Sequence, residues 1–411
     1  MRAAAAPALA LALAAAACDT PTAPTVLVYR DRPIEVAPAS TGWKAVSVGA
    51  AHSCGIRLDG ALYCWGSNAS GQLGVDAARG KCGRFRSACE AGPRAVAPTL
   101  RFLHVSAGQR HTCAITTERR LYCWGDNVSF QVGVQGEFMV FAPTPIMPEA
   151  QFLDVGAGLT HTCAVRTNGV VYCFGDGTLG ALGFGDTTTS VFPRPIDTQE
   201  RFTRVSAGRL RSCAIALDGA AWCWGLEWES ADGGFEYYHQ RLSPHRINAL
   251  PALRSISVSA ISMCAVSVEG ISLCWEANSF GQLGDGTTAG TATPTPVATD
   301  DRFLDVSSGI IQSCGTRVDG VAFCWGNNSF GQLGVPRPGE FCGSLECSRR
   351  PIAVFGQQRF VSIVTGLGNH SCGVSSTTAV LCWGLGADGQ LGDGFTRDRQ
   401  SLPVGVLAPT P

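Results

Sequence analysis

Short apolar runs separated by glycine and proline make up most of this 411-residue chain. No segment places its apolar residues at the three- and four-residue spacing of an amphipathic helix over any length. Runs of this kind, punctuated by turn residues, are typical of short β-strands. The pattern therefore predicts an all-β protein.

The predicted strands fall into a unit that recurs about every 50 residues, which indicates a repeat architecture. Each unit contains a Pro-rich segment, an apolar stretch such as FLDVGAG and two cysteines with nine residues between them, and most units add a GxLG turn. About four strands per unit and seven units predict a seven-bladed β-propeller of four-stranded blades over residues 32–407. The repeats are expected near residues 43–92, 102–146, 152–196, 202–247, 253–297, 303–352 and 360–406.

The paired cysteines flank a hairpin, as in HSCGIRLDGALYCWG from His52 to Gly66. Its centre at Asp59 gives a three-residue loop, whose last residue adopts the left-handed conformation and is usually glycine. Gly60 stands there, and five of the seven units have glycine at this place, while Arg119 and Thr378 occupy the other two. In this register the two cysteines face each other, so we expect a disulfide that staples each hairpin. The expected bonds are Cys54–Cys64, Cys113–Cys123, Cys163–Cys173, Cys213–Cys223, Cys264–Cys274, Cys314–Cys324 and Cys372–Cys382.

The remaining cysteines separate into two close pairs and one single residue. Cys82 and Cys89 lie in one long insertion, and Cys342 and Cys347 lie in another, so each pair is expected to staple its own loop. Nineteen cysteines exceed what a reduced compartment holds unless they bind metal or catalyse. Zinc sites need ligands at closer spacing than nine intervening residues, so we expect disulfides, an oxidising compartment, and no metal or other cofactor.

The N-terminal segment resembles a bacterial lipoprotein signal. Arg2 precedes an apolar run, Ala3–Ala17, that is too short to span a bilayer and ends at Cys18. We expect a signal peptide over residues 1–18, lipidation of Cys18 and a Pro/Thr linker over residues 19–31. The usual leucine three positions before the cysteine is Ala15 here, which leaves open an ordinary cleaved signal and plain secretion.

The units resemble the regulator of chromosome condensation repeat. The first unit carries HSCGI, DG, LYCWGSN and GQLG, and the sixth carries QSCGT, DG, AFCWGNN and GQLG. The resemblance covers about residues 43–407 and implies a seven-bladed propeller. The fourth unit departs from it, because GLEWESADGGFEYYHQRLS replaces the GQLG turn, and the fifth carries Glu276 where glycine belongs. Arg211, Ser262 and Gln312 replace the histidine found at His52, His111, His161 and His370.

The histidines and tryptophans that recur in the repeats are expected to have structural roles. The recurring histidines are predicted to hydrogen-bond neighbouring turns, and the tryptophans after the second cysteine to pack between blades. We find no Ser/His/Asp set and no zinc signature, and the GQLG turns lack the lysine of a phosphate loop.

Three long loops break the repeat and are the candidate binding elements: Val75–Pro93, Leu226–Ser243 and Val335–Pro351. Counting the Pro-rich segment first places all three after a fourth strand, on the face that bears the histidine turns. The competing interpretation is that these surface loops vary in sequence without any function. The candidate contact residues are Arg79, Lys81, Arg84, Arg86, Trp228, Phe235, Tyr237, Tyr238, Arg349 and Arg350.

These features favour an exported, lipid-anchored scaffold of the cell envelope, without catalytic activity, that binds a protein or glycan partner. A net charge of -1 argues against nucleic acid, and contact with a membrane is expected only through the lipid. The family resemblance implies an alternative, a nucleotide-exchange factor for a small GTPase, and a propeller lyase or glycosidase is a further one. We expect a monomer whose ring is closed by Arg32–Val36 or Leu402–Val406, paired beside the other terminus in one blade.

Overall fold

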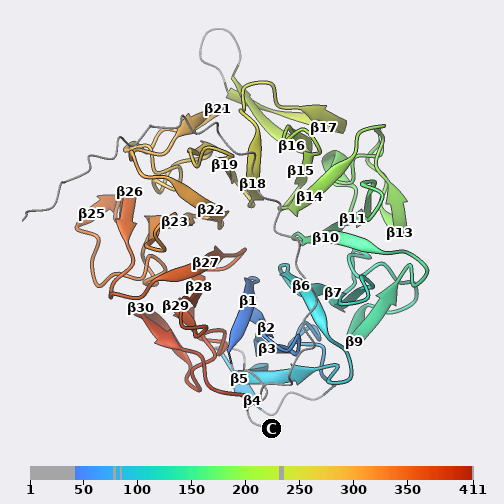
Figure 1. The fold of residues 1–411 in the computed structure, drawn as a ribbon, viewed down its shortest axis with the longest axis horizontal. Helices are drawn as coiled ribbons and strands as arrows, with labels where there is room; N and C mark the ends of the chain where they lie inside the picture. Colours follow the sequence, from blue (N-terminus) through green and yellow to red (C-terminus); the bar gives the residue numbers. More distant parts are fainter. Residues whose placement is uncertain (1–41, 77–79, 84–85, 231–235, 410–411) are drawn as a thin grey trace, which may run out of the picture. The chain divides into compact units, whose positions relative to one another are not determined.

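A computed structural model describes residues 42–76, 80–83, 86–230 and 236–409. The predicted signal peptide, Cys18, the linker and Arg32–Val36 lie outside these residues. Seven antiparallel sheets are arranged in a ring, and each sheet runs outward one strand at a time (Figure 1). The predicted seven-bladed propeller with four-stranded blades is confirmed. No helix among the described residues is long and apolar enough to cross a membrane.

Equivalent strands of the seven blades occupy equivalent places. The inner strands are β1 (Trp43–Val48), β6 (Phe102–Ala107), β10 (Phe152–Ala157), β14 (Phe202–Ala207), β18 (Leu253–Val258), β22 (Phe303–Ser308) and β27 (Phe360–Thr365). The second strands are β2 (His52–Arg57), β7 (His111–Thr116), β11 (His161–Arg166), β15 (Arg211–Ala216), β19 (Ser262–Ser267), β23 (Gln312–Arg317) and β28 (His370–Ser375). The third strands are β3 (Leu62–Ser67), β8 (Leu121–Asp126), β12 (Val171–Gly175), β16 (Ala221–Ser230), β20 (Ser272–Glu276), β24 (Ala322–Asn327) and β29 (Val380–Gly386).

The outer strands carry the Pro-rich segments. They are β5 (Ser87–Val96), β9 (Met139–Ile146), β13 (Ser190–Pro195), β17 (Glu236–Arg246), β21 (Thr291–Pro296), β26 (Leu345–Ala353) and β30 (Arg397–Gly405). Two blades add a short fifth strand, β4 (Gly80–Cys82) or β25 (Glu340–Cys342), and a 3-10 turn, η1, spans Thr178–Gly180.

The position of the Pro-rich segments corrects the strand count made from the sequence. Each such segment pairs with the third strand that precedes it, as β9 does with β8, so it closes a blade rather than opening one. The chain returns antiparallel beside the third strand of its own repeat in every blade. The long insertions therefore join third to fourth strands. They still share a face of the ring with the turns before the second strands, because alternate connections of an antiparallel sheet lie at the same end.

The ring closes without a blade shared between the two ends of the described chain. Of the two candidate closing strands, Arg32–Val36 lies outside the described residues, and residues 402–405 lie in β30, which pairs with β29 of the same repeat. Strand β1 instead joins blade seven through the hydrogen bond from the Trp43 amide to the Thr378 carbonyl, 2.8 Å long. A separate closing strand is unnecessary here because each repeat already supplies four strands.

The cysteine hairpins have the predicted register. Cys54 pairs directly with Cys64, and the same register recurs in every blade. The Cα atoms of the seven bonded pairs lie 4.0–4.1 Å apart. Gly60 has a φ of 83°, and Arg119 and Thr378 adopt the same left-handed conformation at 62° and 63°. The turn geometry therefore persists where its usual glycine is missing.

The three insertions form β-hairpins, which corrects the expectation of loops. The disulfide Cys82–Cys89 ties β4 to β5, and Cys342–Cys347 ties β25 to β26. In blade four, β16 and β17 continue past the end of the ordinary third strand and pair as far as Ser230 and Glu236. The aromatic residues of this segment favour strands, so the extension follows from composition as well as from pairing.

Neighbouring blades are joined by a buried set of hydrogen bonds, which we call the carbonyl lock. The Gln72 carbonyl, in the GQLG turn of blade one, accepts from Thr112 Oγ1 at 2.8 Å and from Trp124 Nε1 at 3.0 Å, both in blade two. The hydroxyl-to-carbonyl bond recurs at five more junctions: Thr162–Gln131, Ser212–Ala181, Ser313–Gln282, Ser371–Gln332 and Ser53–Gln390. The last of these joins blade seven to blade one.

The histidines and tryptophans take part in these junctions. His52 Nε2 lies 2.9 Å from Thr112 Oγ1 of the next blade, and His111, His161 and His370 make equivalent contacts. The partner is a hydroxyl on a second strand rather than the turn that the sequence suggested. Burial lowers the pKa of His52, His111 and His370 to about 3 and that of His161 to about 4. These rings are therefore neutral parts of the core.

Candidate binding site between the fourth and fifth blades

The junction between blades four and five lacks the carbonyl lock. Blade four has no GxLG turn, so no carbonyl is presented to the next blade. Met263 stands where the hydroxyl residue stands elsewhere and contacts Cys213, with the two sulfurs 3.6 Å apart. The structure records no hydrogen bond from Trp275 Nε1 within the described residues, although five equivalent tryptophans donate to the lock carbonyl. This junction is thus built differently from the other six.

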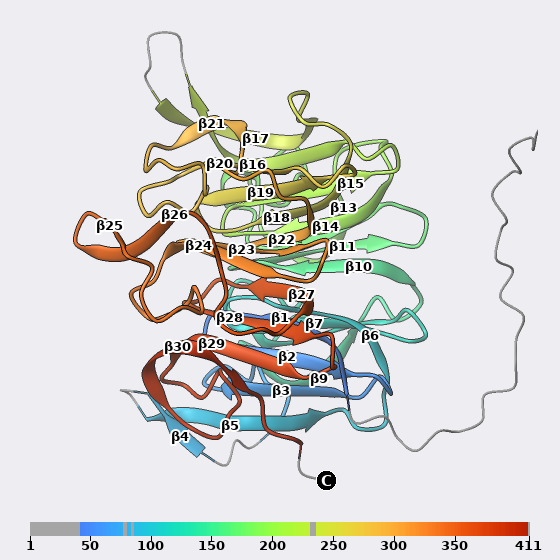
Figure 2. The same cartoon turned by 60° about the vertical axis from the view of Figure 1, so that its left-hand side comes forward.

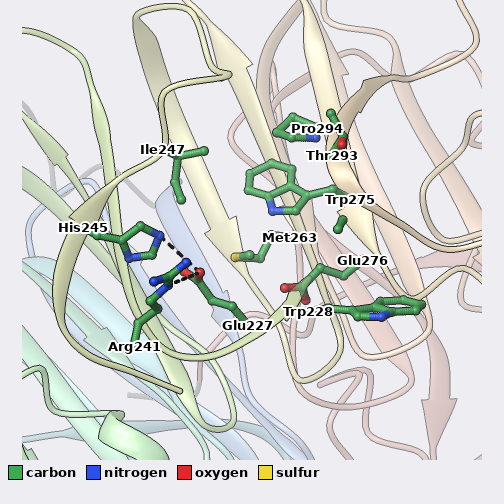
Figure 3. A pocket seen from close by; sticks show the side chains of 11 residues that line it. Glu227, Trp228, Arg241, His245, Ile247, Met263, Trp275, Glu276, Thr293 and Pro294 are labelled. Carbon is green, nitrogen blue, oxygen red and sulfur yellow. Dashed lines mark ion pairs between the residues drawn. The ribbon is translucent and has the colours of Figure 1, made fainter. Parts of the chain in front are cut away.

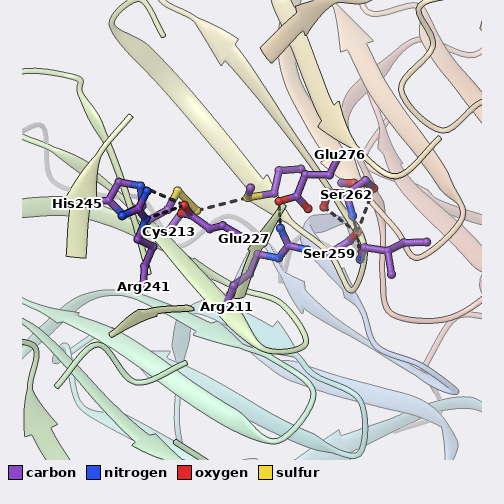
Figure 4. Close-up of polar contacts among 12 residues, drawn as sticks. Arg211, Cys213, Glu227, Arg241, His245, Ser259, Ser262 and Glu276 are labelled. Atoms are coloured by element: carbon purple, nitrogen blue, oxygen red, sulfur yellow. Dashed lines mark hydrogen bonds and ion pairs between the residues drawn. A yellow bond between two sulfur atoms is a disulfide. The ribbon is translucent and has the colours of Figure 1, made fainter. Parts of the chain in front are cut away.

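A buried ion pair replaces the lock at this junction. Arg211 begins β15 at the histidine position, and its guanidinium contacts the carboxylate of Glu276 at the end of β20 (Figure 4). The two side chains are only 3% and 2% exposed. Both residues are departures from the repeat, and they meet because the first residue of a second strand reaches into the next blade. An unpaired charge at this depth would be strongly destabilising, so each residue requires the other.

Glu276 also holds a backbone conformation that favours glycine. Its φ is 82°, and the equivalent Gly225 and Gly326 have φ values of 100° and 98°. A residue with a Cβ in this region costs about 1–2 kcal/mol relative to the ordinary conformation. The carboxylate is therefore placed here in spite of local strain, which is a common property of functional positions.

A pocket of about 280 Å³ opens at the same junction (Figure 3). Blade four lacks the GxLG turn, whose leucine is fully buried in other blades, as Leu73 and Leu283 are. The floor is formed by buried Met263, Trp275 and Glu276. The other lining residues are Glu227, Trp228, Arg241, His245, Ile247, Ala292, Thr293 and Pro294. Most of the lining comes from the third and fourth strands of the two blades, and Met263 comes from the second strand β19 of blade five.

The extended hairpin of blade four supplies a second group of charges. Glu227 Oε2 lies 3.2 Å from His245 Nε2 and 3.6 Å from Arg241 Nε (Figure 4). The Glu227 side chain is 10% exposed, whereas those of Arg241 and His245 are 38% and 31% exposed. The acid is thus buried beneath a more open cationic rim.

Each of the two acids keeps one oxygen without a hydrogen bond among the described residues. These atoms are Glu227 Oε1 and Glu276 Oε2, and both are buried. Burial raises the pKa of Glu276, while the nearby Arg211 guanidinium opposes the rise. Buried acceptors are normally satisfied, so two in one pocket need an explanation. A bound group with hydrogen-bond donors supplies one.

Trp228 spans the two blades at the edge of the pocket. Its ring lies against Gly290, where a Cβ would approach it to 2.4 Å. On its other side it stacks with Tyr238, with ring centroids 6.3 Å apart and planes inclined by 27°. Tyr238 is 61% exposed. The aromatic pair therefore forms a wall that reaches solvent.

The structure brings only part of the predicted contact set to this site. Trp228 lines the pocket and Tyr238 adjoins it, while Tyr237 is described only as backbone of β17. Arg79, Arg84 and Phe235 lie outside the described residues. Lys81 and Arg86 are exposed in blade one, and Arg349 and Arg350 are exposed in blade six. The three hairpins extend toward the same side of the ring (Figure 2), but they are on separate blades and do not form one patch.

Sequence reasoning missed the charged residues that make the pocket distinctive: Arg211, Glu227, Arg241, His245 and Glu276. The signal was present, because both the missing GQLG turn and the glutamate in a glycine position are visible in the sequence. No group of three or more His, Cys, Asp or Glu side chains suited to a metal ion occurs among the described residues. The chemistry of the site is that of hydrogen bonding beside aromatic surfaces.

Two sequence profiles of the regulator of chromosome condensation (RCC1) repeat match the chain and together cover more than half of it. One matches residues 43–72, 102–131 and 152–181, and the other matches residues 59–115, 120–165, 168–215 and 319–374.

Individual relatives match less of the chain. The human protein named probable E3 ubiquitin-protein ligase HERC6 is 32% identical over 102 residues, which is 24% of this chain and 9% of that protein. The ultraviolet-B receptor UVR8 of Arabidopsis thaliana is 29% identical over 99 residues, or 24% of this chain and 19% of that protein. The chain thus spans less than a fifth of the length of either relative.

Solved structures share the fold over most of the chain. Yeast RCC1 (Prp20), solved in complex with Kap60, superposes with a TM-score of 0.72 at 18% sequence identity. The superposition covers 93% of this chain and 91% of the yeast chain. Human WBSCR16 gives a TM-score of 0.65 at 20% identity, with 79% and 84% covered. At these identities the likeness establishes the fold alone.

Proposed function

The chain belongs to the regulator of chromosome condensation (RCC1) repeat family, and we propose that it is an exported, lipid-anchored and non-catalytic scaffold that binds a protein or glycan partner. The observation that carries the proposal is the pocket between blades four and five. Six junctions repeat one lock, and the seventh replaces it with a pocket, a strained Glu276 and a buried ion pair. A rigid ring with one specialised junction suits binding by loops on a fixed frame.

The aromatic wall and the extended hairpin support the same face for the partner. Trp228 and Tyr238 offer a large apolar area with few rotatable bonds, which is a property of interface hot spots. Both belong to the blade-four hairpin, beside the mouth of the pocket. The proposed partner surface is therefore the extended hairpin and the pocket beneath it.

Export and anchoring rest on the cysteines and on the N-terminal sequence. Nine disulfides lie within the described residues, and such a number is typical of an oxidising compartment. Cys18 is the one cysteine outside these pairs, and it ends the apolar segment Ala3–Ala17. A lipid on its sulfur and amine would hold the propeller at a membrane through residues 19–31.

The binding proposal is tested by replacing residues 226–243 with a short Gly-Ser turn. The matched control replaces residues 339–347 of the blade-six hairpin with the same turn, so that Cys342 and Cys347 are removed together and no unpaired cysteine is left. Each variant is used to capture partners from a crosslinked membrane fraction, after non-reducing peptide mapping has verified its disulfides. We expect partners to be lost only with the blade-four variant. Equal capture by both variants would refute this surface, and selective capture of a small GTPase would favour an exchange factor.

The anchoring proposal has a separate test. Mass spectrometry of the mature protein is expected to find an acylated Cys18 as its first residue. Cys18→Ser is expected to move the protein from the membrane fraction to the soluble fraction. Retention of Cys18→Ser in the membrane, or an unmodified mature N-terminus, would contradict the lipid anchor while leaving the binding surface unaffected.

A further inference from the structure

We propose that the pocket between blades four and five binds one uncharged pyranose ring of a glycan. This inference rests on the proposed binding function and names the chemistry of its partner. It follows from three properties of the pocket: its balanced charge, its unused hydrogen-bonding atoms and its aromatic surfaces.

The charges that surround the pocket already balance. Among the described side chains, Glu276 is paired with Arg211, and Glu227 is paired with Arg241. A cationic or anionic ligand would add an uncompensated charge beside buried Glu276, which is expensive at low local dielectric. An uncharged ligand avoids this penalty.

The unused atoms include both acceptors and a donor. Glu276 Oε2 and Glu227 Oε1 are buried acceptors without partners among the described residues. Trp275 Nε1 is a donor that lines the pocket and lacks the carbonyl that its equivalents use. A hydroxyl group both donates and accepts, whereas an ammonium or guanidinium group only donates and a phosphate group mainly accepts and carries negative charge. Neighbouring hydroxyls on one ring therefore complement the pocket better than any charged group.

The remaining lining is flat and apolar. Trp275 at the floor and Trp228 at the edge present ring surfaces, and Pro294 and Ile247 complete the apolar part. The C–H face of a pyranose packs on such surfaces while its hydroxyls turn toward the polar wall. A volume of about 280 Å³ is near the small end of ligand sites, so it suits a single ring rather than an oligosaccharide. The open rim at Arg241 and His245 leaves a path for the rest of the glycan.

The test measures binding of methyl glycosides of glucose, galactose, mannose and N-acetylglucosamine to the full mature chain. Agmatine and inorganic phosphate serve as the charged comparison probes. Saturation-transfer NMR detects binding, and intrinsic tryptophan fluorescence gives the affinity. We expect at least one glycoside to bind more tightly than either charged probe.

Two substitutions at equivalent positions separate the site from the fold. Trp275→Phe removes the unused donor and is expected to weaken the glycoside about 5–10-fold, the effect of losing one hydrogen bond. Trp325→Phe removes the same atom from a carbonyl lock in blade six, so it is expected to leave glycoside affinity unchanged.

Each outcome either supports the inference or overturns it. A glycoside that binds wild type and Trp325→Phe equally, and Trp275→Phe more weakly, supports it. Tighter binding of agmatine, equal effects of the two tryptophan variants, or no glycoside binding up to the solubility of the probes overturns it. If no glycoside binds but residues 226–243 are still needed for partner capture, the scaffold function stands and only its glycan chemistry fails.

Discussion

Acidification is expected to destabilise the propeller through its four buried histidines. His52, His111, His161 and His370 are neutral in the fold, with pKa values of about 3–4, because burial disfavours the charged ring. In the unfolded chain they titrate near the ordinary value of 6.5. The unfolded state therefore takes up more protons as the pH falls below 6.5, so stability is complete above that pH and is lost below it.

The size of the effect follows from this difference. Lowering the pH from about 7.5 to about 5.5 favours the unfolded state by about 1.4 kcal/mol for each such histidine, or about 5–6 kcal/mol for four. Asp305 acts in the opposite direction, because burial raises its pKa to about 6 and the folded protein takes up a proton in this window. That contribution offsets about 1 kcal/mol. Burial also raises the pKa values of Glu276 and Asp388, which act in the same direction as Asp305, so the expected net loss is at most about 4–5 kcal/mol.

Denaturant unfolding between pH 8 and pH 5, followed by tryptophan fluorescence, measures this loss. Glutamine is the control residue, because Gln312 of blade six occupies the histidine position and donates a hydrogen bond to Thr365 Oγ1 at 2.6 Å. His111→Gln is expected to reduce the pH dependence by about 1.4 kcal/mol over the same two units, and Gln312→His to increase it by as much. An unfolding free energy that stays constant to pH 5.5, or is unaffected by both substitutions, would refute the reasoning.

Three further predictions concern the junctions and hairpins. Glu276→Gly relieves the backbone strain at a φ of 82° but leaves Arg211 buried without its partner, so the free energy of unfolding is expected to fall by about 2–4 kcal/mol. Adding Arg211→Met is expected to recover most of this loss. A Glu276→Gly variant as stable as wild type would contradict the prediction. Ser313→Ala removes the hydroxyl that donates to the Gln282 carbonyl at 2.9 Å, and chemical denaturation is expected to find a loss of about 1 kcal/mol, whereas no loss would show that the lock bond is dispensable. Non-reducing peptide mapping is expected to find every cysteine of the propeller bonded within its own hairpin, as Cys54 is to Cys64, and a bond between blades would disprove the assigned register.

The periodic parts of the fold were accessible from the sequence because their causes are local. A hairpin centred on Asp59 dictates which cysteines face each other, and Gly60 supplies the conformation that the turn needs. The role of the Pro-rich segments was not accessible in this way. A short β-prone segment between two hairpins can pair with either one, and only the three-dimensional arrangement shows that it returns to the preceding hairpin.

The candidate site was visible as a set of departures but not as a site. Glu276 in a glycine position and the missing GQLG turn both attract attention in the sequence. Their connection depends on a contact between residues 65 positions apart, Arg211 and Glu276, across two blades. Predicting it requires knowing that the start of a second strand reaches the end of the third strand in the next blade. The contact of His52 with Thr112 differs, because it joins two second strands.

The carbonyl lock also bears on how freely repeats of this chain can be rearranged. At six junctions a blade offers its successor the same carbonyl and receives a hydroxyl in return, so those contacts do not distinguish one neighbour from another. Duplication, deletion or exchange of repeats would preserve them. Blades four and five differ, because Arg211 and Glu276 are tolerable only together. Their order is therefore fixed, and recombination within the gene must keep this pair of repeats as a single heritable unit.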